Sequence, residues 1–230
     1  MGMIKTEEEI EKLKKASLLA DACFEFICHR INIGMTENEI AKCMDDYMLS
    51  NGATALSFET IVGSGENSSK IHSTPTDRKI QYGDIILLDF GCVVEGYCSD
   101  ISRTIFVGEI KEEYKEIYQI VLEAQQKGIE KITNGMTSKE ADLVCREVIN
   151  NKGYDFAHAV GHGVGTEVHE APVISSKRED VLENNMVFTI EPGIYLENKF
   201  GVRIEDTVLL KDGKVEPLNH VTKEIVIIEA

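Results

Sequence analysis

Apolar residues recur at every third or fourth position in two long stretches of the chain, one in each half. The positions are Ile10, Leu13, Ser17, Ala20, Phe24, Ile27 and Ile31 in the first stretch, and Ile117, Val121, Ala124, Gly128 and Ile132 in the second. A helix with this spacing places those side chains on one face, where they can pack against a core. The pattern therefore predicts a long amphipathic helix near the start of each half.

A short motif repeats after each of these stretches. Residues 34–39 read Gly-Met-Thr-Glu-Asn-Glu, and residues 135–140, which lie 101 positions later, read Gly-Met-Thr-Ser-Lys-Glu. Both copies contain Thr-x-x-Glu, in which the threonine hydroxyl accepts a hydrogen bond from a free backbone N–H and the glutamate accepts one from the threonine N–H. Each copy predicts the start of a shorter helix, and Gly52 and Gly153 are placed to end the two helices.

Two continuous apolar runs, 85–88 and 186–190, are typical of buried strands, and an acid follows each run at once. A second acid follows each first one after a segment with turn residues. The four acids are Asp89 and Asp100 in the first half, and Glu191 and Glu205 in the second. Each half therefore predicts two helices and a hairpin that carries two carboxylates.

The repeat covers approximately residues 7–107 and 110–210. Neither half alone could cover its own sheet well. We therefore expect an α+β fold, in which two halves related by a pseudo-twofold axis form a curved, mainly antiparallel sheet covered by helices. We also expect a single domain over residues 1–230, with the strands facing one central site.

The four acids predict a metal site. A carboxylate at the end of a buried strand is costly unless its charge is compensated. One such acid could simply be exposed beyond its strand, but two at equivalent places, each followed by another acid, would repel one another strongly without cations. We therefore predict that Asp89, Asp100, Glu191 and Glu205 bind divalent cations.

A histidine in a glycine-rich segment completes this group. His162 lies in the sequence Gly-His-Gly-Val-Gly at 161–165, and glycines allow the backbone to approach other strands closely. One imidazole with several carboxylates suits manganese, cobalt, iron or zinc at a hydrolytic site, whereas structural zinc sites usually contain thiolates. We add His162 to the predicted metal ligands.

Two further histidines share a sequence context. His72 and His169 both stand in the pattern apolar-His-x-x-Pro, which favours equivalent roles at the site over incidental places on the surface. Arg103 and Arg203 each lie within three residues of an acid. Each arginine could either screen that acid or hold a substrate carboxylate. His158 stays open between a structural role and a place behind the site.

Composition narrows the partners and the compartment. The formal net charge of −16 argues against nucleic acid and against an anionic membrane surface, because both attract clustered basic residues. No apolar run approaches the length of a bilayer span, and the first residues do not read as a signal peptide. Six cysteines without a Cys-x-x-Cys pair indicate reduced thiols, so we expect a cytoplasmic protein.

With these residues assembled, the chain resembles the pita-bread metallopeptidases, and within them the Xaa-Pro peptidase branch of proline dipeptidase and aminopeptidase P. The resemblance runs from about Glu7 to Glu224. It rests on Asp-Phe-Gly at 89–91, Gly-Tyr-Cys-Ser-Asp-Ile-Ser-Arg-Thr at 96–104, Gly-His-Gly-Val-Gly at 161–165, Val-His-Glu at 168–170, Glu-Pro-Gly-Ile-Tyr at 191–195 and Gly-Val-Arg-Ile-Glu-Asp-Thr at 201–207. That branch usually carries an additional N-terminal domain, which we expect to be absent here. Because that domain often supplies the dimer contact, its absence leaves the oligomeric state open, with a homodimer as one alternative.

The resemblance implies two divalent metal ions, typically manganese or cobalt, with zinc or iron as alternatives. Asp100 and Glu205 would bridge the two ions. Asp89 would bind one of them, whereas His162 and Glu191 would bind the other. A water made acidic by both ions would be the nucleophile.

The resemblance also implies roles in catalysis and in binding of a short peptide substrate. Glu191 would help to move the proton of the attacking water. His72 and His169 would bind the substrate and stabilise the oxyanion that forms at the scissile carbonyl. The role of Arg203 follows from the sequence itself: it lies two residues before Glu205, so on a strand both side chains would point to the same face, where Arg203 could pair with a substrate carboxylate or a main-chain carbonyl.

The leading hypothesis is a peptidase that hydrolyses the Xaa-Pro bond of dipeptides or short peptides. A methionine aminopeptidase is the alternative within the same fold, although its last bridging acid is generally in Glu-His-Thr, whereas residues 205–207 here read Glu-Asp-Thr. A peptide-binding relative without catalysis is the alternative from another class. That alternative is disfavoured, because such relatives lose metal ligands and all five positions are filled here.

Overall fold

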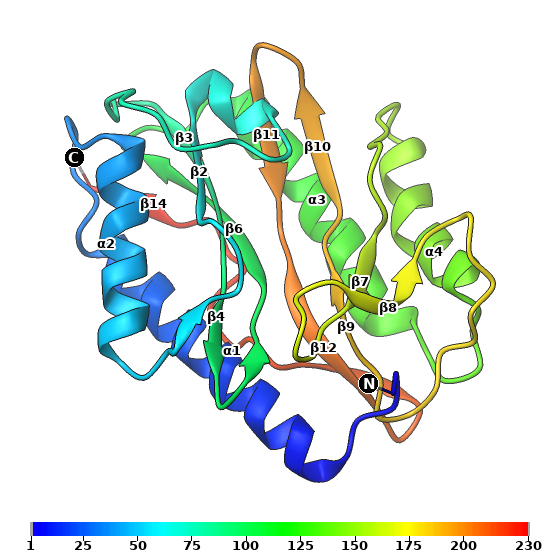
Figure 1. The fold of residues 1–230 in the computed structure, drawn as a ribbon. Coiled ribbons are helices and arrows are strands. Elements are labelled where there is room, and N and C mark those ends of the chain that lie inside the picture. Colours follow the sequence, from blue (N-terminus) through cyan, green and yellow to red (C-terminus); the bar gives the residue numbers. More distant parts are fainter. Residues whose placement is uncertain (1, 230) are drawn as a thin grey trace.

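The computed structural model describes residues 2–229 (Figure 1). Its helices are α1 (Glu7–Cys28), α2 (Glu37–Ser50), α3 (Glu112–Lys131) and α4 (Ser138–Asn150), with the 3-10 helix η1 (Gly65–Ser69). The first strands are β1 (Ala55–Leu56), β2 (Ile61–Ser64), β3 (Ile85–Phe90), β4 (Cys92–Val94), β5 (Tyr97–Cys98) and β6 (Ile101–Val107). The remaining strands are β7 (Gly161–Gly163), β8 (Glu170–Ile174), β9 (Val187–Ile190), β10 (Gly193–Leu196), β11 (Phe200–Arg203), β12 (Asp206–Lys211), β13 (Lys214–Pro217) and β14 (Ile227–Ile228).

The helices begin where the repeated motif predicts. Thr36 and Thr137 cap α2 and α4, and both motifs form complete capping boxes. Thr6 and Glu9 form a third capping box at the start of α1, which the repeat does not predict. The predicted apolar faces of the two long helices are buried, so the helical periodicity of the sequence is confirmed.

Two sheets form the centre of the molecule. One has the strand order β14-β6-β3-β2, and the other has the order β13-β12-β9-β7-β8. Neighbouring strands are antiparallel except for β14, which is parallel to β6. Figure 1 shows α1 and α2 beside the first sheet, and α3 and α4 beside the second. The expected α+β class with mainly antiparallel strands is therefore confirmed.

The two sheets meet at a seam between β6 and residues 203–205. Ser102 and Glu205 form an antiparallel bridge, in which Glu205 N donates to Ser102 O at 3.1 Å. Thr104 Oγ1 donates to Arg203 O at 2.9 Å. β6 begins directly after Asp100, and residues 203–205 end on Glu205, so the seam joins the two halves where each carries its second acid.

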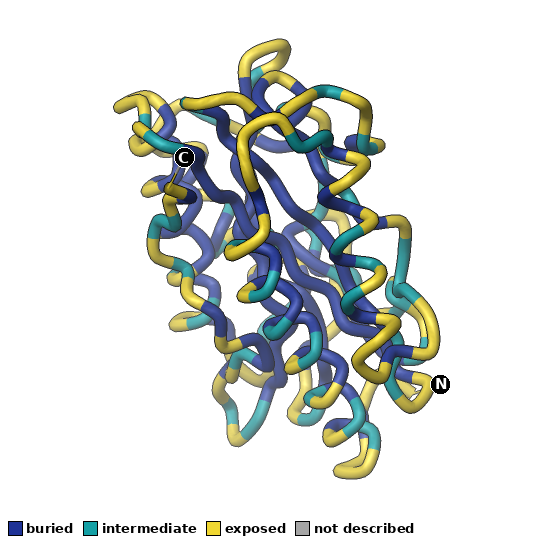
Figure 2. The backbone as a smooth tube through the Cα atoms, turned by 90° about the vertical axis from the view of Figure 1, so that its left-hand side faces the viewer, coloured by how far each residue is buried: buried dark blue, intermediate teal, exposed yellow. Residues whose placement is uncertain are grey.

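The interior follows the same division. One large apolar cluster packs mainly around α1, α2 and the first sheet, and another around α3, α4 and the second. Figure 2 shows the buried central strands and the exposed outer turns of the helices. Across residues 2–229, no helix is both long enough and apolar enough to cross a bilayer.

Candidate active site

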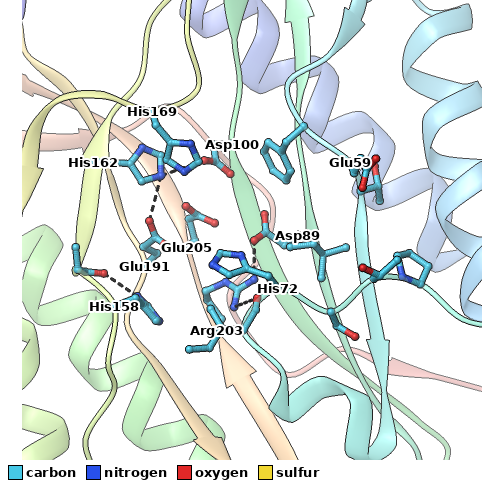
Figure 3. A pocket seen from close by; sticks show the side chains of 18 residues that line it. Glu59, His72, Asp89, Asp100, His158, His162, His169, Glu191, Arg203 and Glu205 are labelled. Atoms are coloured by element: carbon cyan, nitrogen blue, oxygen red, sulfur yellow. Dashed lines mark hydrogen bonds and ion pairs between the residues drawn. The ribbon is translucent and has the colours of Figure 1, made fainter.

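A cavity of about 530 Å³ opens at the seam. All the residues predicted for the site line it, namely His72, Asp89, Asp100, His162, His169, Glu191, Arg203 and Glu205. Figure 3 shows the carboxylates and His162 directed toward one another, with His72 and His169 on two sides of the group in this view. The walls of the cavity also include the apolar side chains of Phe58, Ile61, Ile71 and Pro75.

Equivalent elements of the two halves deliver the acids. Asp89 lies near the end of β3, and Glu191 directly follows β9. Asp100 directly precedes β6, and Glu205 directly precedes β12. The two acids at the strand ends are similarly exposed, since the side chain of Asp89 is 13% exposed and that of Glu191 is 16% exposed. Asp100 and Glu205, at the seam, are 4% and 1% exposed.

His162 lies among these carboxylates. Its Nε2 is 3.4 Å from Asp100 Oδ2 and 3.3 Å from Glu191 Oε1. Its Nδ1 lies 3.1 Å from Gly163 O, which can only accept, so Nδ1 carries a proton. A neutral imidazole would therefore turn the lone pair of Nε2 toward the acids, as a metal ligand requires. Candidate ligand atoms of Asp100, His162 and Glu205 all lie within 4.8 Å of one another.

The glycines around His162 have the role that the sequence predicts. A Cβ at Gly161 would overlap the carbonyl of Thr189 on β9, and a Cβ at Gly163 would overlap the carbonyl of Ala171 on β8. Strand β7 can approach both neighbours only because these positions lack side chains. The close approach brings His162 to the seam.

Burial and proximity shift the pKa values of the group. Burial raises the pKa of Asp100 to about 7, and burial together with the neighbouring acids raises the pKa of Glu205 well above its usual range. Burial acts to lower the pKa of His162, but its contacts with Asp100 and Glu191 raise it well above the ordinary value. Burial acts to raise the pKa of Glu191, but the hydrogen bond and charge of His162 lower it to about 2. Near neutral pH, the site without cations holds protons in their place.

Arg203 connects both halves of the site and is 2% exposed. Its Nη2 donates to Asp89 Oδ2 at 2.6 Å, and its Nε donates to Ser102 Oγ at 2.9 Å. Ser102 Oγ in turn donates to Glu205 Oε2 at 2.6 Å. Arg203 and Glu205 line one cavity, as expected, but the strand does not run through them: β11 ends at Arg203, and Ile204 separates it from Glu205.

One oxygen of Asp89 gives a test of whether the site suits a metal. Oδ1 is buried and has no hydrogen-bond partner within residues 2–229. Burial raises the pKa of Asp89, although the charge of Arg203 opposes this. An oxygen without a partner beside three other acids and one imidazole nitrogen is a donor set that divalent cations prefer. The residues therefore fit the cofactor that the sequence predicts.

A chain of hydrogen bonds behind Arg203 was not apparent from the sequence. Arg203 Nη1 donates to Tyr195 OH at 2.9 Å, and Tyr195 OH lies 2.8 Å from His158 Nε2. His158 Nδ1 lies 2.7 Å from Ala159 O and must carry a proton to donate to it. Burial lowers the pKa of His158, so its Nε2 is free to accept from Tyr195. His158 therefore lines the cavity and supports Arg203; its place in the sequence, four residues before His162, is the only signal that could have indicated this.

The paired histidines come from loops of different construction. His169 lies beside His162, with ring centroids 4.2 Å apart, and burial followed by the charge of His162 lowers its pKa. His72 is exposed on the segment between η1 and β3. Both histidines line the cavity, so the two residues that share the His-x-x-Pro pattern lie at the same site.

Arg103 does not face the cavity acids. Its Nη2 donates to Asp206 Oδ1 at 2.7 Å, and Asp206 also accepts from Gln125 and Lys223. Arg103 Nη1 donates to the backbone carbonyl of Glu205. This buried network holds Glu205 from behind, and the screening alternative for Arg103 applies to Asp206 rather than to Asp100.

The chain matches Metallopeptidase family M24 over residues 11–212. It is 44% identical to the Xaa-Pro dipeptidase of Pyrococcus furiosus over 227 residues, which are 98% of this chain and 65% of that protein. The solved structure of an X-Pro aminopeptidase from Thermotoga maritima is similar, with a TM-score of 0.95, 45% identity, and coverage of 98% of this chain and 65% of that one. The Xaa-Pro dipeptidase from Bacillus anthracis gives a TM-score of 0.96 and 45% identity over 98% of this chain and 64% of that one.

These similarities extend over nearly the whole chain and include the seam with its acids. They confirm the expected pita-bread fold. The chain spans about 65% of the length of the curated relatives that it matches. On the family match and on the identity to these relatives, the chain belongs to metallopeptidase family M24.

Proposed function

We propose that this protein is a dinuclear-metal peptidase that hydrolyses the Xaa-Pro bond of dipeptides or short peptides. One observation carries the proposal: four carboxylates and the Nε2 face of His162 line one cavity at the seam. The names of the similar proteins, an Xaa-Pro dipeptidase and an X-Pro aminopeptidase, support the substrate class. We further propose that the two halves act as one catalytic domain.

The proposed ligands divide between two ions. Asp100 and Glu205, one from each half, would bridge them. Asp89 would hold one ion through Oδ1, and His162 and Glu191 would hold the other. Manganese or cobalt are the proposed ions, with zinc or iron as alternatives, because the donors are oxygen atoms and one imidazole nitrogen. When bound, the ions would neutralise the acids and make a water molecule acidic enough to attack a peptide carbonyl.

The surrounding side chains would orient the substrate and move protons. Glu191 would accept a proton on its carboxylate and pass it to the leaving proline nitrogen. His169, whose pKa is lowered by burial, would donate a hydrogen bond as a neutral imidazole to the developing oxyanion. His72 would hold the substrate from the other loop.

The contacts of Arg203 favour a role in orienting the acids over a contact with a substrate carboxylate. A guanidinium group has five N–H donors, and four hydrogen bonds from Arg203 go to Asp89, Ser102, Tyr195 and Ile71 O. The direct contact with substrate would have to use the remaining N–H. A cytoplasmic location and a homodimer stay predictions.

The test is a comparison of substrates with the metal-loaded protein. Values of kcat/KM would be measured for Leu-Pro, Met-Pro, Met-Ala-Ser and a longer Xaa-Pro peptide with manganese or cobalt added. We expect the Xaa-Pro substrates to be hydrolysed fastest. A preference for Met-Ala-Ser would favour the methionine aminopeptidase alternative, and a preference for the longer Xaa-Pro peptide would favour an aminopeptidase P.

A binding protein without catalysis predicts a different result. It would bind these peptides with no turnover under any metal. Because chelation removes the nucleophile as well as the charge compensation, an active enzyme should lose turnover in a chelator and regain it when metal is returned.

A further inference from the structure

The segment before α1 lies against the second half of the molecule. Ile4 forms an antiparallel bridge with Met186, and Lys5 N donates to Asn185 O at 2.8 Å. The Lys5 side chain is 1% exposed, and its ammonium group donates at 2.7 Å to Glu170, which lies 165 positions further along the chain. A buried ammonium group needs a charged partner, so this contact fixes the segment at one point of the second half.

Glu170 closes the turn from 165 to 170, which carries His169. One carboxylate oxygen accepts from Glu167 N at 3.1 Å, and the other is the acceptor for the buried ammonium group. A Cβ at Gly165 would overlap the carboxylate. The carboxylate therefore fills the inside of the turn, and the turn is built around a single charged group.

His169 directly precedes Glu170, so its position depends on this turn. Its ring lies 4.2 Å from the ring of His162 between centroids, and both rings line the cavity. A turn that lost its central ion pair would relax and carry the His169 ring with it. Misplacement of a catalytic group by about 1 Å can reduce a rate by up to roughly 100-fold.

We propose that Lys5 is a positioning residue, which acts through Glu170 to hold His169 at the scissile carbonyl. This inference rests on the proposed function of the cavity. An ion pair that only stabilised the fold could lie anywhere in the core, whereas this pair closes the turn beside a proposed catalytic side chain. The ion pair between Lys12 and Glu8 on α1 is local and lies nearer the surface, with side-chain exposures of 26% and 80%, and gives a matched control.

The first test compares Lys5→Met, Lys5→Arg and the control Lys12→Met in the full chain loaded with manganese. For Leu-Pro hydrolysis, Lys5→Met should lower kcat by about 10-fold, a smaller misplacement than the limit above. KM and metal content should stay within about twofold, because the metal ligands are held by other contacts. Lys5→Arg should restore most of kcat, and Lys12→Met should leave it unchanged. A fall in kcat for Lys12→Met equal to that for Lys5→Met would overturn the proposal.

A double-mutant cycle separates positioning from general loss of structure. In a His169→Ala background, Lys5→Met should cause no further fall in kcat, because the ring on which it acts is gone. Independent, multiplicative losses would show that Lys5 acts elsewhere and would overturn the proposal. Where Lys5→Met does not fold, Glu170→Gln offers a second variant that keeps the shape of the carboxylate without its charge.

An NMR experiment tests the proposal without activity. Histidine ring signals of the zinc-loaded full chain would be recorded, and the His169 signal would be identified by its loss in His169→Ala. That signal should shift in Lys5→Met and stay in place in Lys12→Met. An unmoved signal would overturn the proposal. Wild-type protein that hydrolyses no Xaa-Pro peptide would overturn the proposed function, and the ring signals would still decide whether Lys5 positions His169.

Discussion

The two halves of the molecule are built alike, but they differ in the residue that lies beside the strand-end acid of each half. In each half, a strand pairs with the acid at the end of its neighbour, Asp89 or Glu191. Two residues beyond the paired position stands Gly63 in the first half and His162 in the second. A Cβ at Gly63 would come within 2.9 Å of the backbone carbonyl of Asn67, so the first half has no room for a ligand there. The repeat supplies paired acids, whereas His162 has only Gly63 as its counterpart, and this difference would make the two proposed metal positions chemically different.

The halves also hold their histidine loops by unrelated anchors. In the first half, the fully buried Glu37 accepts from Ser64 N at 2.7 Å and from Thr76 N at 3.0 Å, so it ties the two ends of the loop that carries His72. Its counterpart 101 positions later is Ser138, whose buried Oγ has no partner in the part of the chain that the structure describes. The loop of the second half depends on Lys5 and Glu170 instead. Equivalent functional groups can therefore be held in place by contacts that are not equivalent.

The two halves should be most alike at Asp100 and Glu205, the proposed bridging acids. We expect Asp100→Asn and Glu205→Gln each to reduce turnover by roughly 1000-fold or more, since each would remove a charge that is proposed to compensate two cations. Metal content by elemental analysis should fall by at least one ion per chain. The exposed Asp46, which pairs with Lys42 on the surface, provides the control variant Asp46→Asn. Full turnover of Asp100→Asn at unchanged metal content would contradict the assignment.

The paired histidines test whether equal sequence context means equal contribution. His169→Ala should lower kcat by roughly 100-fold, as for a lost oxyanion donor, and should keep its metal. His72→Ala should lower kcat less, by about 10-fold, because His72 is exposed and its loop is held from inside by Glu37. Steady-state kinetics and metal analysis of both variants give the comparison. If metal content collapsed in His169→Ala, His169 would be a ligand and the five-residue site would be wrong.

Substitutions at the equivalent positions 37 and 138 should differ in their effect on the free energy of unfolding. Glu37→Ala removes the carboxylate that accepts from the buried Ser64 and Asn67 and from Thr76, which should lower the free energy of unfolding by about 2–4 kcal/mol. Ser138→Ala removes a hydroxyl without a described partner and should change it by less than about 0.5 kcal/mol. Urea unfolding of the metal-loaded variants measures both values. Equal losses would show that the buried Glu37 contacts contribute nothing specific.

The metal-free protein should show the smallest effect, as a change of stability with pH. The folded protein binds a proton at Asp100 up to about pH 7, whereas the unfolded chain releases it near the ordinary pKa of 3.8. The folded state therefore binds more protons between these values, and its stability falls as pH rises through them. Glu191 has the opposite sign, since its stabilising contribution is lost only as pH falls from 4.5 toward about 2.

Calorimetry of loaded and chelator-treated protein would detect this change. Between pH 5.5 and 7, the difference in Tm between the two forms should widen. Each 1 kcal/mol by which the free energy of unfolding falls in the chelator-treated form should lower its Tm by about 2–4 °C. The loaded form should not show this fall, because cations replace the protons that the metal-free site needs. Chelator-treated Asp100→Asn should lose the part of this dependence that Asp100 contributes, whereas Glu205 and His162, whose pKa values are also raised, should keep theirs. A difference in Tm that narrows as pH rises would have the wrong sign for buried acids with raised pKa values.

Local patterns explain how much of the molecule could be predicted from its sequence. Helix periodicity, capping boxes and strand-end acids are each read over a few residues, and together they predict the repeat and the residues that line the cavity. The network of Arg103, Asp206 and Lys223 leaves no local pattern, because its members are brought together only by the fold. The same is true of Lys5 and Glu170. A shared strand face for Arg203 and Glu205 requires a continuous strand, but β11 ends at Arg203 and Ile204 separates it from Glu205.

The seam also sets the order in which this protein can be made. Ser102 and Glu205 contact each other across 103 positions of the chain, so the first half leaves the ribosome with Asp89 and Asp100 but without the strands that complete their surroundings. Contacts between such distant residues form slowly, because a long loop must close, at a cost in entropy, before the contacts can stabilise the fold. A nascent chain cannot complete this cavity until residue 205 has been synthesised and released from the ribosomal tunnel. Binding of the proposed metal pair therefore follows synthesis of residue 205, and translation pauses in the second half would lengthen the time during which Asp89 and Asp100 lack the other proposed ligands.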